Sequence, residues 1–257
     1  MNRETIRIAG VELELFTAGT GAPLLFLHSG QGLIPDHHYL ALLGKNHRLI
    51  APSHPGFGQS ELPDWLDSID DIAHLYLELM DRLKLDRVAL IGASIGGWIA
   101  AEIASTVPER ISKLVLVGPV GVKLGPPDKL DVPDIFVMPL DAVNRLMFHN
   151  PEKFRLDPTK LSDAQLATAV RNRETLALLV WEPYMHNPKL RHRLHRATMP
   201  ALFLRGASDG LVSQSYLEGY TKLLPNARTA VIADAGHAPQ VEQPERFADA
   251  VLSFLGN

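Results

Sequence analysis

The stretch from Gly92 to Gly97 constrains the fold of this 257-residue chain more than any other feature. It follows the largely apolar run 87–91 and precedes the helix-like run 98–104. A serine between two glycines at this spacing, placed after a strand and before a helix, is typical of a nucleophile elbow. The turn requires a strained backbone at Ser94, and Gly92 and Gly96 leave room where side chains would collide. We therefore expect the Ser94 hydroxyl to project above the edge of a sheet.

Two other interpretations of this stretch fit less well. A glycine-rich turn that only packs tightly would not need the partners for Ser94 described below. A phosphate-binding loop would need the Walker lysine or the G-x-G-x-x-G spacing, and the stretch has neither.

Apolar runs alternate with helical patterns along most of the chain. Runs 5–8 and 11–16 predict an antiparallel hairpin at a sheet edge, and the continuous apolar runs predict buried strands. These runs are 23–27, 47–51, 87–91, 113–117, 200–204 and 227–232. Helical periodicity or composition marks 39–43, 69–83, 98–104, 216–223 and 245–255. The alternation predicts an α/β fold with a doubly wound, mostly parallel eight-stranded sheet, whose site lies beyond the carboxyl ends of the strands.

The segment 120–198 interrupts this alternation. It contains no β-rich run but three helical ones, at 140–148, 162–181 and 189–195. We expect an inserted helical cap here, folded over a core made of residues 1–119 and 199–257. An independent domain is less consistent with a short segment that interrupts the sheet.

Composition excludes several functional classes. The chain has no cysteine, so a thiol nucleophile, a disulfide framework and a thiolate metal site are excluded. A formal net charge of -4 argues against a nucleic-acid partner. The first seven residues contain no apolar signal region, and no uncharged apolar run reaches the ~18 residues that span a bilayer. We expect a soluble, cytoplasmic protein without a membrane partner.

The best partners for Ser94 are His237 and Asp209. A serine hydroxyl needs a base to remove its proton, and the base needs a third group to orient it. His237 and Asp209 each directly follow one of the last two predicted strands, so all three side chains should meet at one sheet edge. Asp234 as the acid and His54 as the base remain alternatives.

Backbone donors should stabilise an oxyanion formed at Ser94. We expect one donor to be the N–H of Ile95, the residue after the serine. The other should come from the loop after the strand 23–27, with Gly30 as first choice and Ser29 as second. We expect His28 to support this loop by hydrogen bonding.

A metal site is a weaker hypothesis, although the chain has 11 histidines. The closely spaced histidines lack a convergent set of carboxylates; they are His37, His38, His192 and His195. We therefore expect neither a metal nor another cofactor.

The chain resembles the α/β-hydrolase superfamily over nearly all of its length outside the cap. The residues that carry the resemblance are 28–30, 54–60, 92–97, 206–209 and 236–237. The resemblance implies that Ser94, Asp209 and His237 are nucleophile, acid and base, and that Gly30 and Ile95 form the oxyanion hole. A serine nucleophile argues against haloalkane dehalogenases and epoxide hydrolases, which use aspartate there.

Two residues depart from the family pattern. Ser29 stands where relatives usually have glycine after the histidine, which leaves the second oxyanion donor open. Ala93 precedes the nucleophile, where many relatives have a larger polar or aromatic residue.

Substrate specificity should reside in the cap. Ser29, Trp181 and Tyr184 are candidates for substrate binding, although packing between cap and core is the commoner role for the two aromatic side chains. The basic run 189–196 is either a solvated face or an attractor of acidic substrates.

We expect a cofactor-independent serine hydrolase acting on a small carboxylic ester, like an esterase or lactonase. Alternatives on the same fold are a ligand receptor without turnover, a perhydrolase or haloperoxidase-like enzyme, and a hydrolase of carbon–carbon bonds. A homodimer remains open.

Overall fold

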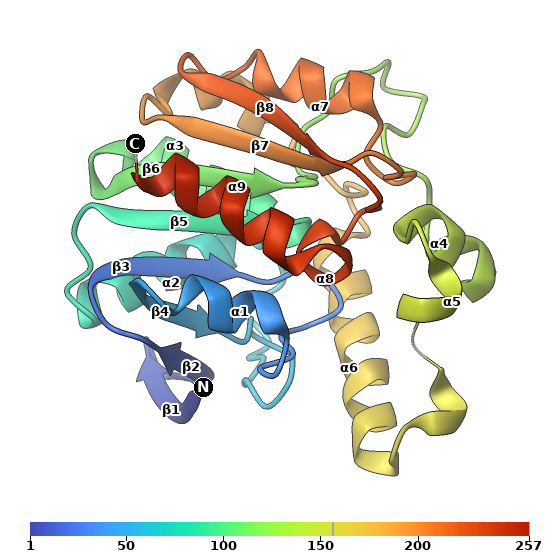
Figure 1. The fold of residues 1–257 in the computed structure, drawn as a ribbon, viewed down its shortest axis with the longest axis horizontal. Helices are drawn as coiled ribbons and strands as arrows, with labels where there is room; N and C mark the ends of the chain where they lie inside the picture. The colour runs from blue at the N-terminus through green and yellow to red at the C-terminus, as the bar shows by residue number, and fades with distance from the viewer. Residues whose placement is uncertain (156, 257) are drawn as a thin grey trace.

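The computed structural model describes residues 1–155 and 157–256. Figure 1 shows the strands of one central sheet with helices on both faces. The eight strands are β1 (Asn2–Ile8), β2 (Val11–Ala18), β3 (Ala22–Leu27), β4 (His47–Pro52), β5 (Val88–Ala93), β6 (Ile111–Val117), β7 (Ala201–Gly206) and β8 (Ala227–Ile232). Their order in the sheet is β1-β2-β4-β3-β5-β6-β7-β8.

Six of the strands, β3 to β8, run parallel, and β1 and β2 form the expected antiparallel hairpin at one edge. Leu27 at the end of β3 pairs with Gly92 on β5, and Val117 at the end of β6 pairs with Leu204 on β7. The parallel strands therefore end at one edge of the sheet, where the loops that follow them lie close together. The predicted fold class is confirmed.

Helices cover the two faces of the sheet, with α1 and α9 in front of it and α2 and α3 behind it in Figure 1. The core helices are α1 (His38–Leu43), α2 (Ile69–Arg82), α3 (Ile95–Thr106), α7 (Gln214–Thr221), α8 (Pro239–Glu242) and α9 (Pro244–Gly256). Alternate residues of β3 face opposite sides, with Leu24 and Phe26 packing in the core beneath α1 and α9, and Leu25 and Leu27 in the core beneath α2 and α3. Burial on both faces explains why the central strands are continuous apolar runs.

Residues 118–200, between β6 and β7, form what we call the insertion. Its helices α4 (Leu140–Met147), α5 (Pro151–Phe154) and α6 (Asp163–Val180) lie on the side of the sheet toward which β3 and β6 point (Figure 1). The run 189–195 differs from expectation. It forms two short 3₁₀ turns, 190–192 and 194–196, in which Leu190 and Leu194 are buried and the basic residues between them are exposed. The division at residues 120 and 198 stays a prediction.

None of the helices in the described part of the chain combines the length and the apolar character that a bilayer crossing demands.

Candidate active site

Ser94 occupies a sharp turn between β5 and α3, with φ 54° and ψ -114°. This positive φ is a strained conformation for a residue with a side chain. A Cβ on Gly92 would come within 2.1 Å of the Gly96 carbonyl oxygen, and a Cβ on Gly96 within 2.2 Å of the Leu27 carbonyl oxygen. The Ser94 N–H also donates to the Val117 carbonyl at 2.8 Å. The two glycines and the neighbouring strand thus hold the turn.

The structure brings Ser94, His237 and Asp209 together in one chain of hydrogen bonds, which we call the relay. His237 Nε2 lies 3.0 Å from Ser94 Oγ, and His237 Nδ1 lies 3.0 Å from Asp209 Oδ2. His237 and Asp209 are 6% and 4% exposed. Because the carboxylate can only accept, Nδ1 carries the proton, and the lone pair of Nε2 is directed at the Ser94 hydroxyl.

Backbone groups fix the orientation of Asp209. Its Oδ1 accepts the N–H groups of Leu211 and Val212, each at 2.9 Å, which leaves Oδ2 to face His237. Asp234, the alternative acid, has a side chain that is 62% exposed and lies 3.2 Å from the Arg246 guanidinium. Of the two acids, only Asp209 is hydrogen-bonded to His237.

Two buried histidines lie under the loop that follows β3. The rings of His28 and His54 stack with centroids 3.7 Å apart. His28 Nδ1 donates to the Ser29 carbonyl at 2.7 Å, and His28 Nε2 accepts the His54 N–H at 2.8 Å. His54 Nε2 donates to the His28 carbonyl at 2.9 Å, and its Nδ1 accepts from the Tyr76 hydroxyl at 2.6 Å. Each of the four ring nitrogens therefore has a hydrogen-bond partner while both imidazoles are neutral.

Burial lowers the pKa of both rings. The pKa of His28 falls to about 4, against a smaller opposing effect of its bond to Ser29. The pKa of His54 lies well below its usual value because of burial and of the charge that His28 would carry. Neither ring nitrogen of His54 contacts the relay, so His54 supports the loop rather than competing with His237 as base.

This pair of histidines also orients the backbone of the loop. The carbonyls of His28 and Ser29 are turned toward the imidazoles, and in a trans peptide the following N–H points the opposite way. The N–H groups of Ser29 and Gly30 therefore point away from the histidine rings. Ile95 is the first residue of α3, where the helix offers its N–H no acceptor.

Helix α6 closes over these loops through polar contacts that the sequence patterns do not reveal. Asn172 accepts the Gly58 N–H through Oδ1 and donates to the Gln31 carbonyl through Nδ2, each at 3.0 Å. Thr175 donates to the Gly56 carbonyl at 2.9 Å. Both side chains are buried. Polar residues at positions that a helical pattern turns inward are the sequence signal for such contacts.

The two aromatic candidates for the substrate pocket have different environments. Tyr184 donates to the Pro133 carbonyl at 2.8 Å and accepts the Ile135 N–H at 3.0 Å, and burial raises its pKa to about 12. It lines a cavity of about 270 Å³ whose walls include no member of the relay. Trp181 is 53% exposed and packs its ring against Phe136. A role for either residue in substrate binding stays a prediction.

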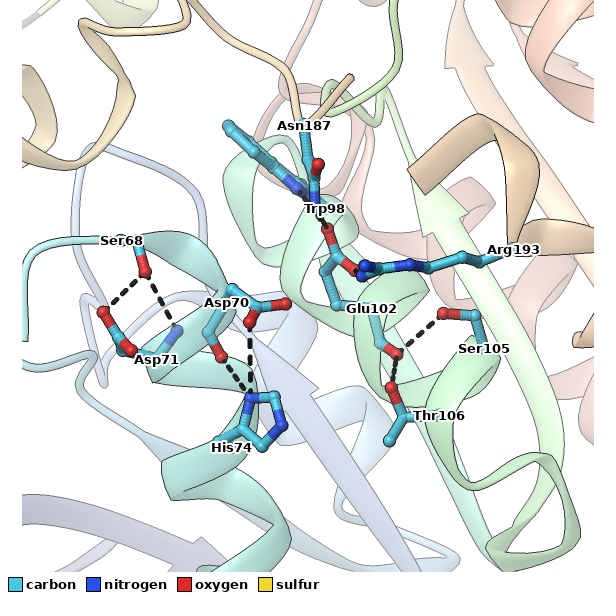
Figure 2. Close-up of polar contacts among 10 residues, drawn as sticks. All are labelled: Ser68, Asp70, Asp71, His74, Trp98, Glu102, Ser105, Thr106, Asn187 and Arg193. Carbon is cyan, nitrogen blue, oxygen red and sulfur yellow. Dashed lines mark hydrogen bonds and ion pairs between the residues drawn. The ribbon is translucent and has the colours of Figure 1, made fainter. Parts of the chain in front are cut away.

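Trp98 lies one turn beyond the nucleophile and is almost completely buried. Figure 2 shows its indole directed at the Glu102 carboxylate. Its Nε1 donates to Glu102 Oε1 at 3.1 Å, and the same oxygen accepts from Asn187 Nδ2 at 2.8 Å. The Arg193 guanidinium lies 3.9 Å from the other carboxylate oxygen. Burial raises the pKa of Glu102, against the lowering by these hydrogen bonds. A Cβ on Gly121 would come within 2.4 Å of the indole, so Trp98 is wedged between α3 and the insertion.

No group of three or more histidine, aspartate or glutamate side chains within residues 1–155 and 157–256 is arranged to hold a metal ion. Of the closely spaced histidines, His38 lies 3.3 Å from the Glu245 carboxylate at the surface.

Comparisons with known proteins identify the family. Residues 24–250 match the sequence model of the Alpha/beta hydrolase family. The chain is 31% identical to a 2-hydroxy-6-oxononadienedioate/2-hydroxy-6-oxononatrienedioate hydrolase from Paraburkholderia phymatum, over 96% of this chain and 92% of that protein. It is 29% identical to a pimeloyl-[acyl-carrier protein] methyl ester esterase from Photobacterium profundum, over 93% and 96%.

Solved structures agree with respect to the fold. A serine hydrolase from the polyaromatic hydrocarbon-degrading bacterium Cycloclasticus zankles superposes with a TM-score of 0.82 at 20% identity, over 99% of this chain and 98% of that one. With the family match over most of its length, the chain belongs to the alpha/beta hydrolase family.

Proposed function

We propose that the protein is a serine hydrolase that cleaves carboxylic esters through an acyl-enzyme. The observation that carries the proposal is the relay, in which Asp209, His237 and Ser94 are hydrogen-bonded in sequence at 3.0 Å per contact. A hydroxyl that donates to an imidazole, itself oriented by a buried carboxylate, is the arrangement that activates serine as a nucleophile. The esterase among the relatives supports the choice of bond.

In the acylation step, Ser94 Oγ attacks the ester carbonyl carbon while His237 Nε2 takes the hydroxyl proton. The carbonyl oxygen becomes an oxyanion, which the N–H groups of Ile95 and Gly30 would stabilise. The imidazolium then gives its proton to the departing alkoxide, and the alcohol leaves. Asp209 stays ionised and stabilises the imidazolium throughout.

In the deacylation step, a water molecule replaces the alcohol. His237 takes a proton from the water as it attacks the acyl carbon, and a second oxyanion forms in the same place. Collapse of this intermediate breaks the bond to Ser94 Oγ, which recovers its proton from the imidazolium. The products are the carboxylic acid and the free enzyme.

Cleavage of a carbon–carbon bond is the second candidate, because one of the relatives described above hydrolyses 2-hydroxy-6-oxo dienedioates. The relay would serve both reactions. A carbon leaving group is a much poorer one than an alkoxide, so the substrate itself must accept the electron pair of the broken bond. The conjugated 2-hydroxy-6-oxo dienedioates on which that relative acts can accept this electron pair.

The test combines a covalent probe with two substrate sets. A fluorophosphonate should label Ser94, Ser94→Ala should abolish labelling, and Ser253→Ala, an exposed serine on α9, should leave it unchanged. The wild-type protein should turn over p-nitrophenyl acetate or longer esters. Turnover of a 2-hydroxy-6-oxo dienoate alone would favour the second candidate. Labelling without multiple turnover in either set would contradict both and favour a receptor.

A further inference from the structure

Glu242 is a buried carboxylate that the relay does not use. It ends the short helix α8 (Pro239–Glu242) and is 6% exposed. Its Oε1 accepts the N–H groups of His149 and Asn150 at 2.9 and 3.2 Å, and its Oε2 accepts the N–H of Gly236. Two of these donors belong to the insertion, and the third belongs to the residue before His237.

The insertion segment 146–150, which we call the strap, lies directly on the loops that carry the base and the acid. The His237 N–H donates to the Met147 carbonyl at 2.6 Å, and the Gly210 N–H donates to the Leu146 carbonyl at 2.9 Å. A Cβ on Gly236 would come within 2.3 Å of the Met147 carbonyl oxygen. The backbones of the strap and of the histidine loop are therefore in direct contact.

Glu242 and Met147 together fix two consecutive backbone donors, those of Gly236 and His237. Two neighbouring N–H groups that are both held define the backbone conformation from which the imidazole projects. Within the described residues, no cation lies within ion-pair distance of the Glu242 carboxylate. The desolvation of the carboxylate is offset only by charge-assisted bonds from backbone groups, which makes these bonds strong and directional.

We propose that Glu242 is a positioning residue, which ties the strap to the histidine loop and thereby holds His237 Nε2 against Ser94 Oγ. The proposal rests on the proposed function of the relay. Misplacement of a reacting group by about 1 Å can reduce a rate ~10²-fold, so a loosened loop should be visible in turnover.

Glu242→Gln is the informative substitution. Three backbone N–H groups face two carboxylate oxygens, and an amide has only one oxygen. The NH₂ group must therefore meet a backbone N–H, which separates either Gly236 or the strap from residue 242. Glu242→Asp keeps the charge but is shorter by one methylene group, and it should give a smaller effect of the same kind.

Glu102→Gln is the matched control. Glu102 is also buried and also joins the core to the insertion, but its two hydrogen-bond donors share one oxygen (Figure 2). The amide oxygen can keep both donors while the NH₂ group turns to the other side. The NH₂ group then faces the Arg193 guanidinium and the ion pair is lost, so this variant should lose stability without a loss of positioning.

The expected result is a fall of at least ~10-fold in kcat and in the fluorophosphonate labelling rate for Glu242→Gln, with KM changed less than ~3-fold. The far-downfield ¹H NMR signal of the His237 Nδ1 proton should weaken or disappear. Glu102→Gln should keep both properties at a comparable Tm. If Glu242→Gln does not fold, Glu242→Asp carries the same comparison.

Wild-type labelling and a wild-type NMR signal in the Glu242 variants would overturn the proposal. So would parallel losses in the Glu242 and Glu102 variants that follow Tm alone. The NMR signal requires no substrate, so it separates the two proposals. If the fluorophosphonate does not label the wild-type protein, but the NMR signal is present in the wild type and lost only in the Glu242 variants, the proposed function is contradicted and the positioning role of Glu242 stands.

Discussion

Replacing Asp209 by asparagine should give the wrong tautomer of His237. The Leu211 and Val212 N–H groups both point at Oδ1, so the amide oxygen of asparagine will stay there. The NH₂ group then takes the place of Oδ2, where it donates to His237 Nδ1. The proton must move to Nε2, which faces Ser94 and can no longer accept the hydroxyl proton.

The size of the effect follows from what is lost. The side chain keeps its volume and its two backbone bonds, so the fold should persist. The base and the negative charge opposite the imidazolium are both lost. The same substitution in a well-studied serine protease lowers kcat by ~10⁴, which corresponds to about 5.4 kcal/mol in activation free energy. We expect Asp209→Asn to lower kcat by between ~10² and ~10⁴.

Hydrolysis of p-nitrophenyl acetate, followed together with Tm, measures the effect. Asp234→Asn is the control, because its side chain is exposed and asparagine tolerates the positive φ of 57° at this position. It should change kcat less than ~2-fold. A nearly silent Asp209→Asn beside a crippling Asp234→Asn would refute the assignment of the acid.

Three further changes test other parts of the structure. The folded protein keeps His28 neutral with a pKa of about 4, whereas the unfolded chain binds a proton near pH 6.5. The contribution of His28 to the free energy of unfolding should therefore be complete above pH 6.5 and should fall by about 3 kcal/mol as the pH drops toward 4. Urea titrations of the wild type and His28→Gln measure this slope, and equal slopes would contradict it. Tyr184→Phe leaves the Ile135 N–H and the Pro133 carbonyl without their partner and should lower the free energy of unfolding by ~1–3 kcal/mol; an unchanged urea midpoint would show that water replaces the hydroxyl. Trp181→Ala should change the ranking of ester chain lengths more than the rate on an acetate ester, and uniform losses on all esters would argue against a role in specificity.

Local patterns were sufficient to predict the fold and the relay. Burial on both faces produces continuous apolar runs, and register in a parallel sheet brings the ends of neighbouring strands together. Ser94, Asp209 and His237 each follow such a strand directly, so their proximity follows from topology without knowledge of side-chain geometry. The glycines at 92 and 96 add a steric requirement that few other turns have.

Contacts made by the insertion could not be predicted in this way. Glu242 binds backbone donors 92 and 93 residues earlier in the chain, and a backbone N–H leaves no mark on the sequence. Asn172 is similar, since its partners are the backbone groups of two separate loops. Helical periodicity at 189–195 gave a wrong expectation because buried leucines four residues apart are also compatible with two 3₁₀ turns.

The absence of a side chain at Gly236 has a consequence for protein engineering. The backbones of the strap and of the histidine loop touch at this glycine, so neither segment can be exchanged by itself without a mismatch with the other. A chimaera that receives a relative's helical segment should therefore take residues 146–150 and 236–242 from the same parent. Grafting at the ends of β6 and β7 alone would join two surfaces that were shaped separately.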